Sequence, residues 1–156
     1  MSAPTALLDT AVPLRRVDQL LAHYALSHQH PTNEGFLYTA LPCIMLSLVG
    51  LLYAANPMFA LVFLGASLVY YWRLSRVFLV TMVAVTVVML AIIATLNAKH
   101  ILLPVCVTIF VVAWIFQFIG HRIEGKKPSF FEDVQYLWVG PLFVLSRLFG
   151  RLGVRW

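Results

Sequence analysis

Two short polar segments of this chain carry side chains whose types and spacing suit metal chemistry. His121 and Glu124 stand three residues apart just after a long apolar run, so on a helix they would share one face. A histidine and a carboxylate placed in this way can bind one metal ion. A second histidine would complete the set of two histidines and one carboxylate that non-haem Fe(II) oxygenases use. The same spacing is common in ordinary polar pairs on surface helices.

His28 is the histidine that the rest of the sequence offers for such a set. Residues 14–30 predict an amphipathic helix, because apolar residues from Val17 to Tyr24 recur at three- and four-residue spacing. His28 falls on that apolar stripe. An unpaired polar group there would cost about 1 to 3 kcal/mol, so the imidazole needs a partner. The partner is a metal ion or a structural hydrogen bond, and the pattern leaves both open.

The remainder of the chain is too apolar for a water-soluble domain. Of its 156 residues, 62% are hydrophobic and 11% are charged. Four runs approach the roughly 20 residues that a helix needs to cross a bilayer. They cover residues 36–55, 58–72, 77–96 and 101–119.

The basic residues predict how these spans are oriented. With four spans, Lys99 is the only lysine or arginine on one side, and all the others fall on the opposite side. Cytoplasmic loops are enriched in positive charge, so both termini are expected in the cytoplasm. The protein is therefore expected in a bacterial inner membrane, or in the endoplasmic reticulum if it is eukaryotic. The net charge of +5 is explained by this orientation, and no nucleic-acid partner is expected.

Proline and glycine residues indicate where several of the predicted helices end or break. We expect the first helix to stop at Pro31, with Thr32 or Asn33 capping the first span. The apolar run 136–149 is short and contains Gly140-Pro141, which predicts a re-entrant or interfacial helix pair. Beyond it, basic residues four apart would form one helical stripe, suited to anionic headgroups or serving as ordinary positive charge. They are Arg147, Arg151 and Arg155.

Together these observations predict an all-α, polytopic membrane helix bundle forming a single domain. Its expected parts, in order, are a flexible N-terminus (1–13), an amphipathic helix (14–30), four spanning helices (36–119), a polar motif loop (120–135) and a re-entrant or interfacial basic helix (136–156). The parity of four spans brings the polar segments before and after them to one face of the membrane. His28 and His121 are therefore expected to meet.

Two stretches of the sequence also resemble a known family. FQFIGHRIEGKKPSFFEDVQYLWVGP begins at Phe116 and YALSHQHPTN begins at Tyr24. They are similar to the signatures of the small membrane family named for the yeast fatty 2-hydroxy-acid dioxygenase of phytosphingosine breakdown. The resemblance implies an Fe(II) enzyme that uses O2, without 2-oxoglutarate, to shorten long-chain 2-hydroxy fatty acids by one carbon. Substrate, O2 and membrane lipids are then the expected partners.

The resemblance also implies site residues. His28 and His121 match histidines of the family pattern, while Asn33, Glu124 and Gln135 match polar positions near them. The implied metal ligands are His28, His121 and Glu124. Leu37 stands where family members usually have a histidine, and His30 is the favoured substitute ligand. If Leu37 removes a required ligand, the alternative is a non-catalytic divergent member that acts as a lipid-binding membrane scaffold.

Other polar residues have supporting roles in this interpretation. Gln117 lies one turn before His121 on the same face, where it could hydrogen-bond a ligand or bridge helices. Glu132 and Gln135 are expected to cap helices or to support the ligands. The substrate carboxylate could be attracted by nearby cations, which otherwise act as solvated charge. These cations are Arg122, Lys126 and Lys127.

Overall fold

The structure is a computed structural model that describes residues 15–26, 28–125 and 136–156. Within those ranges all the regular elements are helices. In chain order they are α1 (Arg16–Ala25), α2 (Pro31–Ala55), α3 (Pro57–Leu74), α4 (Arg76–Ala98), α5 (Leu102–Ile123) and α7 (Val139–Leu152). Helices α2 to α5 are long and apolar enough to cross a membrane. The predicted all-helical membrane bundle is therefore confirmed.

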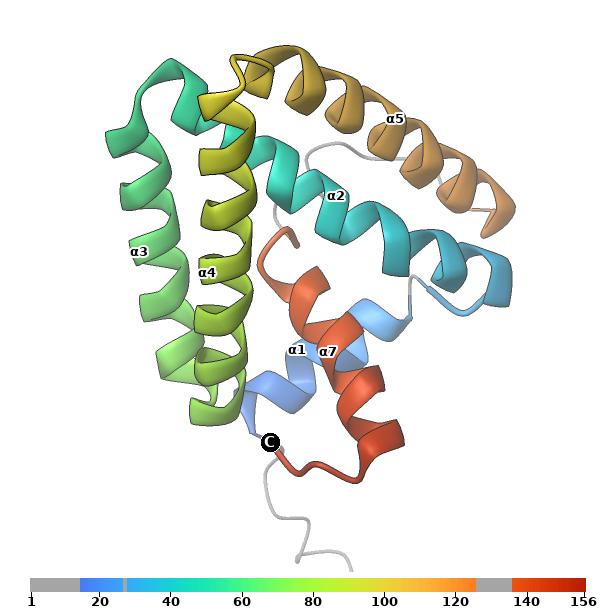
Figure 1. Ribbon diagram of the computed structural model, residues 1–156. Coiled ribbons are helices and arrows are strands. Elements are labelled where there is room, and N and C mark those ends of the chain that lie inside the picture. Colours follow the sequence, from blue (N-terminus) through green and yellow to red (C-terminus); the bar gives the residue numbers. More distant parts are fainter. Residues whose placement is uncertain (1–14, 27, 126–135) are drawn as a thin grey trace, which may run out of the picture.

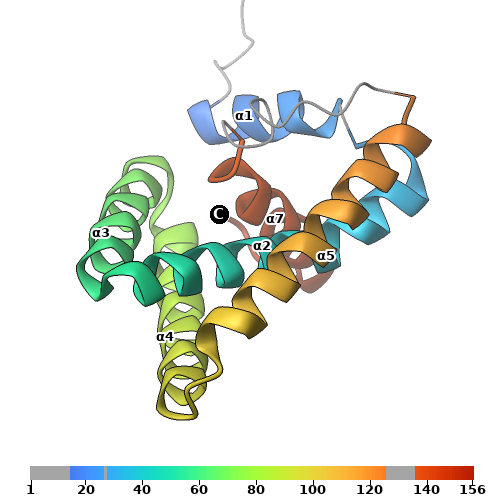
Figure 2. The same cartoon turned by 90° about the horizontal axis from the view of Figure 1, so that it is seen from above.

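The spanning helices form two pairs that diverge from each other. Figure 1 shows α2 lying along α5 and α3 lying along α4, with a steep angle between the pairs. Helix α7 stands in that angle, as the view from above also shows (Figure 2). Helix α1 packs on α7 and lies across the end of the bundle where α2 and α4 begin. It therefore joins the two pairs at that end.

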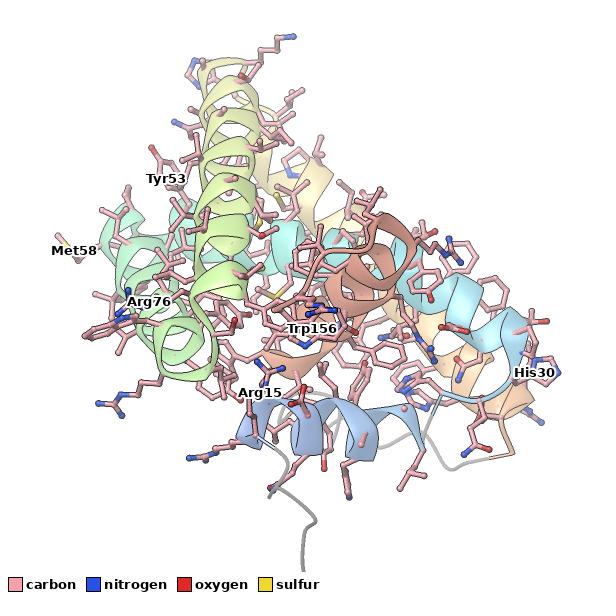
Figure 3. The ribbon with its side chains drawn as sticks, turned by 90° about the horizontal axis from the view of Figure 1, so that it is seen from below. Arg15, His30, Tyr53, Met58, Arg76 and Trp156 are labelled. Atoms are coloured by element: carbon pink, nitrogen blue, oxygen red, sulfur yellow. The ribbon has the colours of Figure 1, made fainter. Side chains whose placement is uncertain are left out.

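Contacts at the two ends of α1 define this end of the molecule. The Arg15 guanidinium donates a hydrogen bond to the backbone carbonyl of Trp156, and both residues lie near the first turn of α1 in Figure 3. The Trp156 ring packs against Phe78 in the first turn of α4, with ring centroids 5.9 Å apart. Past the other end of α1 lies His30, beside the start of α2 (Figure 3).

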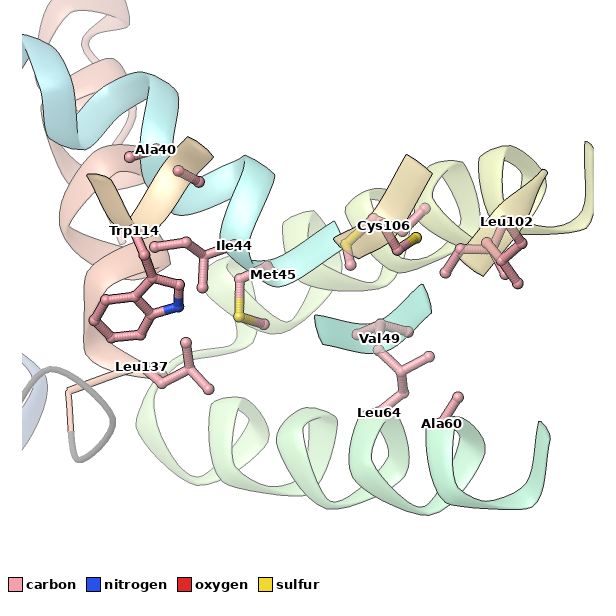
Figure 4. Packing of buried hydrophobic residues seen from close by; sticks show 13 residues of the cluster. Ala40, Ile44, Met45, Val49, Ala60, Leu64, Leu102, Cys106, Trp114 and Leu137 are labelled. Atoms are coloured by element: carbon pink, nitrogen blue, oxygen red, sulfur yellow. The ribbon is translucent and has the colours of Figure 1, made fainter. Parts of the chain in front are cut away.

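The α2–α5 pair is the most extensive helix contact and is closest where a glycine faces a bulkier residue. A Cβ added to Gly50 would lie 2.3 Å from the Cys106 sulfur. Near the other end of the pair, a Cβ on Gly120 would lie 2.2 Å from Oδ1 of Asn33. Buried apolar residues fill the space between these points and toward α3, as Figure 4 shows around Val49. This packing holds the last turns of α5 against the first turns of α2.

Two predicted boundaries at the start of α2 are wrong. Helix α1 ends at Ala25 instead of position 30, and α2 begins at Pro31 instead of position 36. His30 caps α2, because its Nδ1 accepts a hydrogen bond from the Thr32 amide at 3.2 Å. Proline is tolerated in the first turn of a helix, where its missing N–H would have no intrahelical partner. Asn33 consequently lies inside α2 and is fully buried.

Helix α7 is continuous, so the predicted break into a helix pair is also wrong. Gly140 and Pro141 fall in its first turn, where neither residue interrupts the hydrogen-bond ladder. Just before it, the Trp138 indole donates to the Ser67 hydroxyl at 2.8 Å, about halfway along α3. Near its other end, the Phe149 ring lies 5.6 Å from that of Phe78. Helix α7 therefore starts inside the bundle and runs out toward α1.

The predicted stripe of three arginines does not form as expected. Arg147 and Arg151 both lie on α7, but the helix ends at Leu152. Gly153 closes it in the left-handed conformation, with φ of 68°. Arg155 follows this turn and leaves the stripe, because the helical repeat that would align it no longer applies.

Candidate functional site

Four polar side chains are buried where α5 ends against the start of α2. They retain 6% exposure or less and are His28, Asn33, Gln117 and His121. His28 lies in the link between α1 and α2, and Asn33 lies in the first turns of α2. Gln117 and His121 share one face of α5, a helical turn apart. The site is therefore built from two segments about ninety residues apart in the sequence.

The two histidines meet, as the parity of the spans predicts. Their ring centroids lie 5.6 Å apart. Nδ1 of His28 lies 3.1 Å from the backbone carbonyl oxygen of Tyr24, and the two rings stack at 4.4 Å. Because a carbonyl oxygen only accepts hydrogen bonds, Nδ1 carries a proton, and in the neutral ring the lone pair is on Nε2. Histidines that bind metals commonly have this arrangement, with the other ring nitrogen donating to a carbonyl.

Two amide oxygens are buried near this pair. Oδ1 of Asn33 and Oε1 of Gln117 find no hydrogen-bond donor within the described residues. A buried carbonyl without a donor costs about 1 to 3 kcal/mol, so each would gain from a bound cation or a water molecule. Imidazole nitrogens suit Fe(II), and amide oxygens can add harder ligands. This set of donors is chemically compatible with the iron ion that the sequence predicts.

Glu124 holds the link between α1 and α2 in place. Its Oε1 accepts from the Gln29 amide at 2.9 Å. Its Oε2 accepts from the His30 amide at 3.0 Å and from Nδ2 of Asn33 at 2.9 Å. Burial raises the pKa of this carboxyl, but the three hydrogen bonds and the nearby His28 outweigh burial and hold the pKa below its usual range. Both carboxylate oxygens therefore fix the segment that carries His28.

The predicted set of metal ligands is not assembled in this conformation. Within the ranges that the structure describes, no group of three or more His, Cys, Asp or Glu side chains is placed to hold a metal ion. Glu124 is bonded to the link, and His30 is exposed and caps α2. Of the predicted ligands, the structure pairs His28 with His121 alone. The iron ion therefore stays a prediction.

Leu37 is the residue at the position where the sequence resemblance implies a histidine. It lies one turn after Asn33 on α2 and is fully buried. It belongs to an apolar cluster that also contains Tyr24, Leu41 and Phe143. A side chain at position 37 therefore extends from the polar site into the hydrophobic core.

The remaining predicted residues lie outside the buried group. Arg122 is exposed on the last turn of α5. His23, which is not among the predicted site residues, is also exposed, and its Nδ1 lies 3.0 Å from the Tyr136 hydroxyl. The other candidates fall outside the described residues. They are Lys126, Lys127, Glu132 and Gln135.

Sequence reasoning missed the contacts that join α7 to the site. The centroid of the Phe143 ring lies 6.3 Å from that of His28, and Cζ of Arg147 lies 5.1 Å from the Phe143 ring centroid. Arg147 also pairs with Glu34 of α2 at 3.1 Å. The contact of Tyr24 with His28 could have been predicted from the sequence, because the two residues are four positions apart, which is about one helical turn. The contacts of α7 could not, since they join segments that are distant in the sequence.

The fold and the buried histidine pair define a class of helical membrane protein with a polar site at one end of its bundle. Comparison with protein families then identifies the group. Residues 14–152 match the family described as "Mpo1-like: 2-hydroxy-palmitic acid dioxygenase Mpo1-like", and the chain belongs to this family. No curated protein and no solved structure matches the chain.

Proposed function

We propose that this protein is an Fe(II)-dependent dioxygenase that converts a long-chain 2-hydroxy fatty acid into the acid one carbon shorter. Family membership supports the reaction class. The single observation that carries the proposal is the buried pair of His28 and His121, with Nδ1 of His28 donating to the Tyr24 carbonyl. A polar site bordered by an apolar cluster, at the end of four membrane-spanning helices, also suits a substrate with a long hydrocarbon chain.

The overall reaction needs no second reductant. One 2-hydroxy acid and one O2 give the shortened acid, CO2 and water, and oxidation of the two terminal carbons supplies all the electrons that reduce O2. Fe(II), when bound, would bring O2 and the 2-hydroxy acid together. His28 and His121 would hold it, with the amide oxygens of Asn33 and Gln117 as candidate further donors.

The surrounding residues fix the position and orientation of His28 in this site. The Tyr24 carbonyl fixes the proton of His28 on Nδ1, and the Tyr24 ring limits how the imidazole can turn. Glu124 fixes the preceding link through two backbone amides. The site is thus held by groups that make its geometry costly to change.

One observation favours a second candidate function. Leu37 is fully buried, and the sequence resemblance implies an imidazole at its position. A member that lacks this ligand would keep the fold and bind lipids without oxidising them. Metal content separates the two proposals, because the scaffold needs no iron.

The test uses the full chain in lipid nanodiscs, loaded anaerobically with Fe(II). We expect about one tightly bound iron per chain. With 2-hydroxypalmitate we expect O2 consumption and formation of the acid one carbon shorter, whereas palmitate should give neither. His121→Ala should lose both iron and turnover, while His23→Ala should keep both, because His23 is exposed and bonded to Tyr136. Full turnover by His121→Ala would overturn the proposed site, and a wild-type protein that binds no iron would favour the scaffold.

A further inference from the structure

A long apolar recess lies between α2, α4 and α7, and nothing discussed so far uses it. Its volume is about 480 Å³. The recess is lined along α4 from Thr81 to Ile92, along α2 from Leu41 to Leu46 and on α7 by Pro141, Val144 and Leu145. It occupies part of the angle between the two helix pairs that is visible in Figures 1 and 2.

The lining has too few polar groups to hold ordered water. Thr81 contributes the only side-chain hydroxyl of the lining, and it donates to the Val77 carbonyl of its own helix at 3.0 Å. A buried water molecule needs two to four polar partners, and this recess does not provide them. An empty recess would forfeit the dispersion contacts of its walls. The favourable occupant is therefore a hydrocarbon.

The dimensions of the recess indicate which hydrocarbon. From Thr81 to Ile92 the wall on α4 rises about 16 Å, at 1.5 Å per residue. The hydrocarbon core of a bilayer is about 30 Å thick, so one leaflet accounts for about half of that. The recess is therefore about as long as the hydrocarbon of one leaflet, which is the length of a single acyl chain.

One end of the recess is on the side of the histidine pair. Helix α4 begins at the end of the bundle where α2 begins and α5 ends. Helix α1 lies across that end, with Arg15 near Trp156 at its start and His28 just past its last residue. The recess starts at Thr81, five residues after the start of α4, and stops at Ile92, six residues before its end, so it lies midway along the helix. Its Thr81 end is the one nearer the side that carries His28 and His121.

The recess opens toward lipid along one edge. Val88 lines it and yet is 58% exposed, so this residue stands at its mouth. Helices α4 and α7 have no extensive contact with each other. A chain could therefore enter sideways from the bilayer, without crossing the water phase.

We infer that this recess, the acyl groove, binds the hydrocarbon chain of the long-chain 2-hydroxy acid, drawn laterally from the bilayer, with its polar end toward the histidine pair. This inference rests on the proposed function for the identity of the chain. Leu41 connects the two regions, because it lines the groove and follows Leu37 by one turn on the same face of α2.

The experiment compares two neighbouring residues of α4. Val88→Trp fills the mouth of the acyl groove, whereas Val87→Trp adds the same bulk at a residue that is 61% exposed and does not line it. We expect Val88→Trp to raise KM for a sixteen-carbon 2-hydroxy acid at least about tenfold, since each buried methylene contributes markedly to binding. An eight-carbon substrate should be affected far less, and Val87→Trp should behave as wild type. Equal effects of the two variants on the long substrate would overturn the inference.

A second measurement does not depend on turnover. Wild-type protein in nanodiscs is photolabelled with a palmitic acid analogue that carries a diazirine near its chain end, and the labelled peptides are mapped. Labelling concentrated on residues 81–92 and 141–145, and reduced by excess 2-hydroxypalmitate, supports the acyl groove even if O2 consumption fails. Labelling spread over the outer faces of α3 and α5, or groove labelling that excess 2-hydroxypalmitate leaves unchanged, overturns it.

Discussion

Nδ2 of Asn33 donates a hydrogen bond to Oε2 of Glu124 at 2.9 Å, joining the first turn of α2 to the end of α5. The same carboxylate also accepts from two backbone amides of the preceding link. One side chain therefore sets the position of the segment that carries His28. The structure gives Glu124 a positioning role, which can be separated experimentally from metal binding.

Replacing Glu124 by Gln should loosen this link. The amide keeps one oxygen acceptor but turns an NH2 group toward a donor, so at least one hydrogen bond is lost. Because Glu124 is only partly buried, we expect a loss of about 1 to 2 kcal/mol in the free energy of unfolding. Hydrogen exchange should accelerate at the amides of Gln29 and His30. Both quantities can be measured on detergent-solubilised protein.

Glu34→Gln provides the matched control for that variant. The Glu34 side chain also bonds neighbours, Tyr38 and Arg147. Only its backbone amide contacts the link, at the His30 carbonyl, and the substitution leaves that bond in place. Exchange at Gln29 and His30 should stay as in wild type. Unchanged exchange in Glu124→Gln as well would show that this carboxylate does not hold the link.

The lowered pKa of Glu124 predicts how stability depends on pH. A carboxyl whose pKa is lower in the folded state stabilises the fold above its unfolded pKa of about 4.3. That contribution is lost as the pH falls through the folded pKa. The difference in Tm between wild type and Glu124→Gln should therefore be constant near neutral pH and shrink below about pH 4. A difference that stays the same down to pH 3 would contradict this assignment.

Gly120→Ala should disturb the site from the α5 side. The new Cβ would lie 2.2 Å from Oδ1 of Asn33, so Asn33 has to move and its bond to Glu124 is strained. Overpacking of this kind costs about 1 to 3 kcal/mol. Gly65→Ala is the control, because a Cβ there meets nothing within 4 Å. In the interior of α3 it should raise stability by about 0.5 to 1 kcal/mol. Thermal unfolding of both variants measures the contrast, and equal changes would mean that the Gly120 contact is not tight.

The sequence was sufficient to predict the spans and the meeting of the two histidines. Long apolar runs identify membrane helices, and four spans necessarily return the chain to its starting side. Such arguments do not say which groups bond across the assembled site. Backbone amides carry no sequence signature, so the bonds from Gln29 and His30 to Glu124 were not foreseeable. For the same reason the sequence predicted Glu124 as a metal ligand, although both of its carboxylate oxygens accept hydrogen bonds within the fold.

Local chemistry that depends on exact backbone positions was equally hard to predict. His30 caps α2 because the helix begins one residue later, at a proline. The helical periodicity that placed Arg155 on a stripe stops at Gly153, whose left-handed conformation ends α7. In both cases the residue types were evident, while the helix end that decides their role depends on tertiary packing.

Leu37→His is the variant that distinguishes a working site from a divergent one. Position 37 lies one turn beyond Asn33 on the buried face of α2, within the core that borders the histidine pair. If iron binds there, an added imidazole gains a partner, and we expect iron affinity to rise by about tenfold or more. Without a bound ion, the same imidazole is a buried polar group in an apolar cluster and should lower the free energy of unfolding by about 1 to 3 kcal/mol. Iron titration and thermal unfolding of one preparation measure both quantities. Destabilisation that iron does not reverse would argue that the histidine pair holds no ion in this protein.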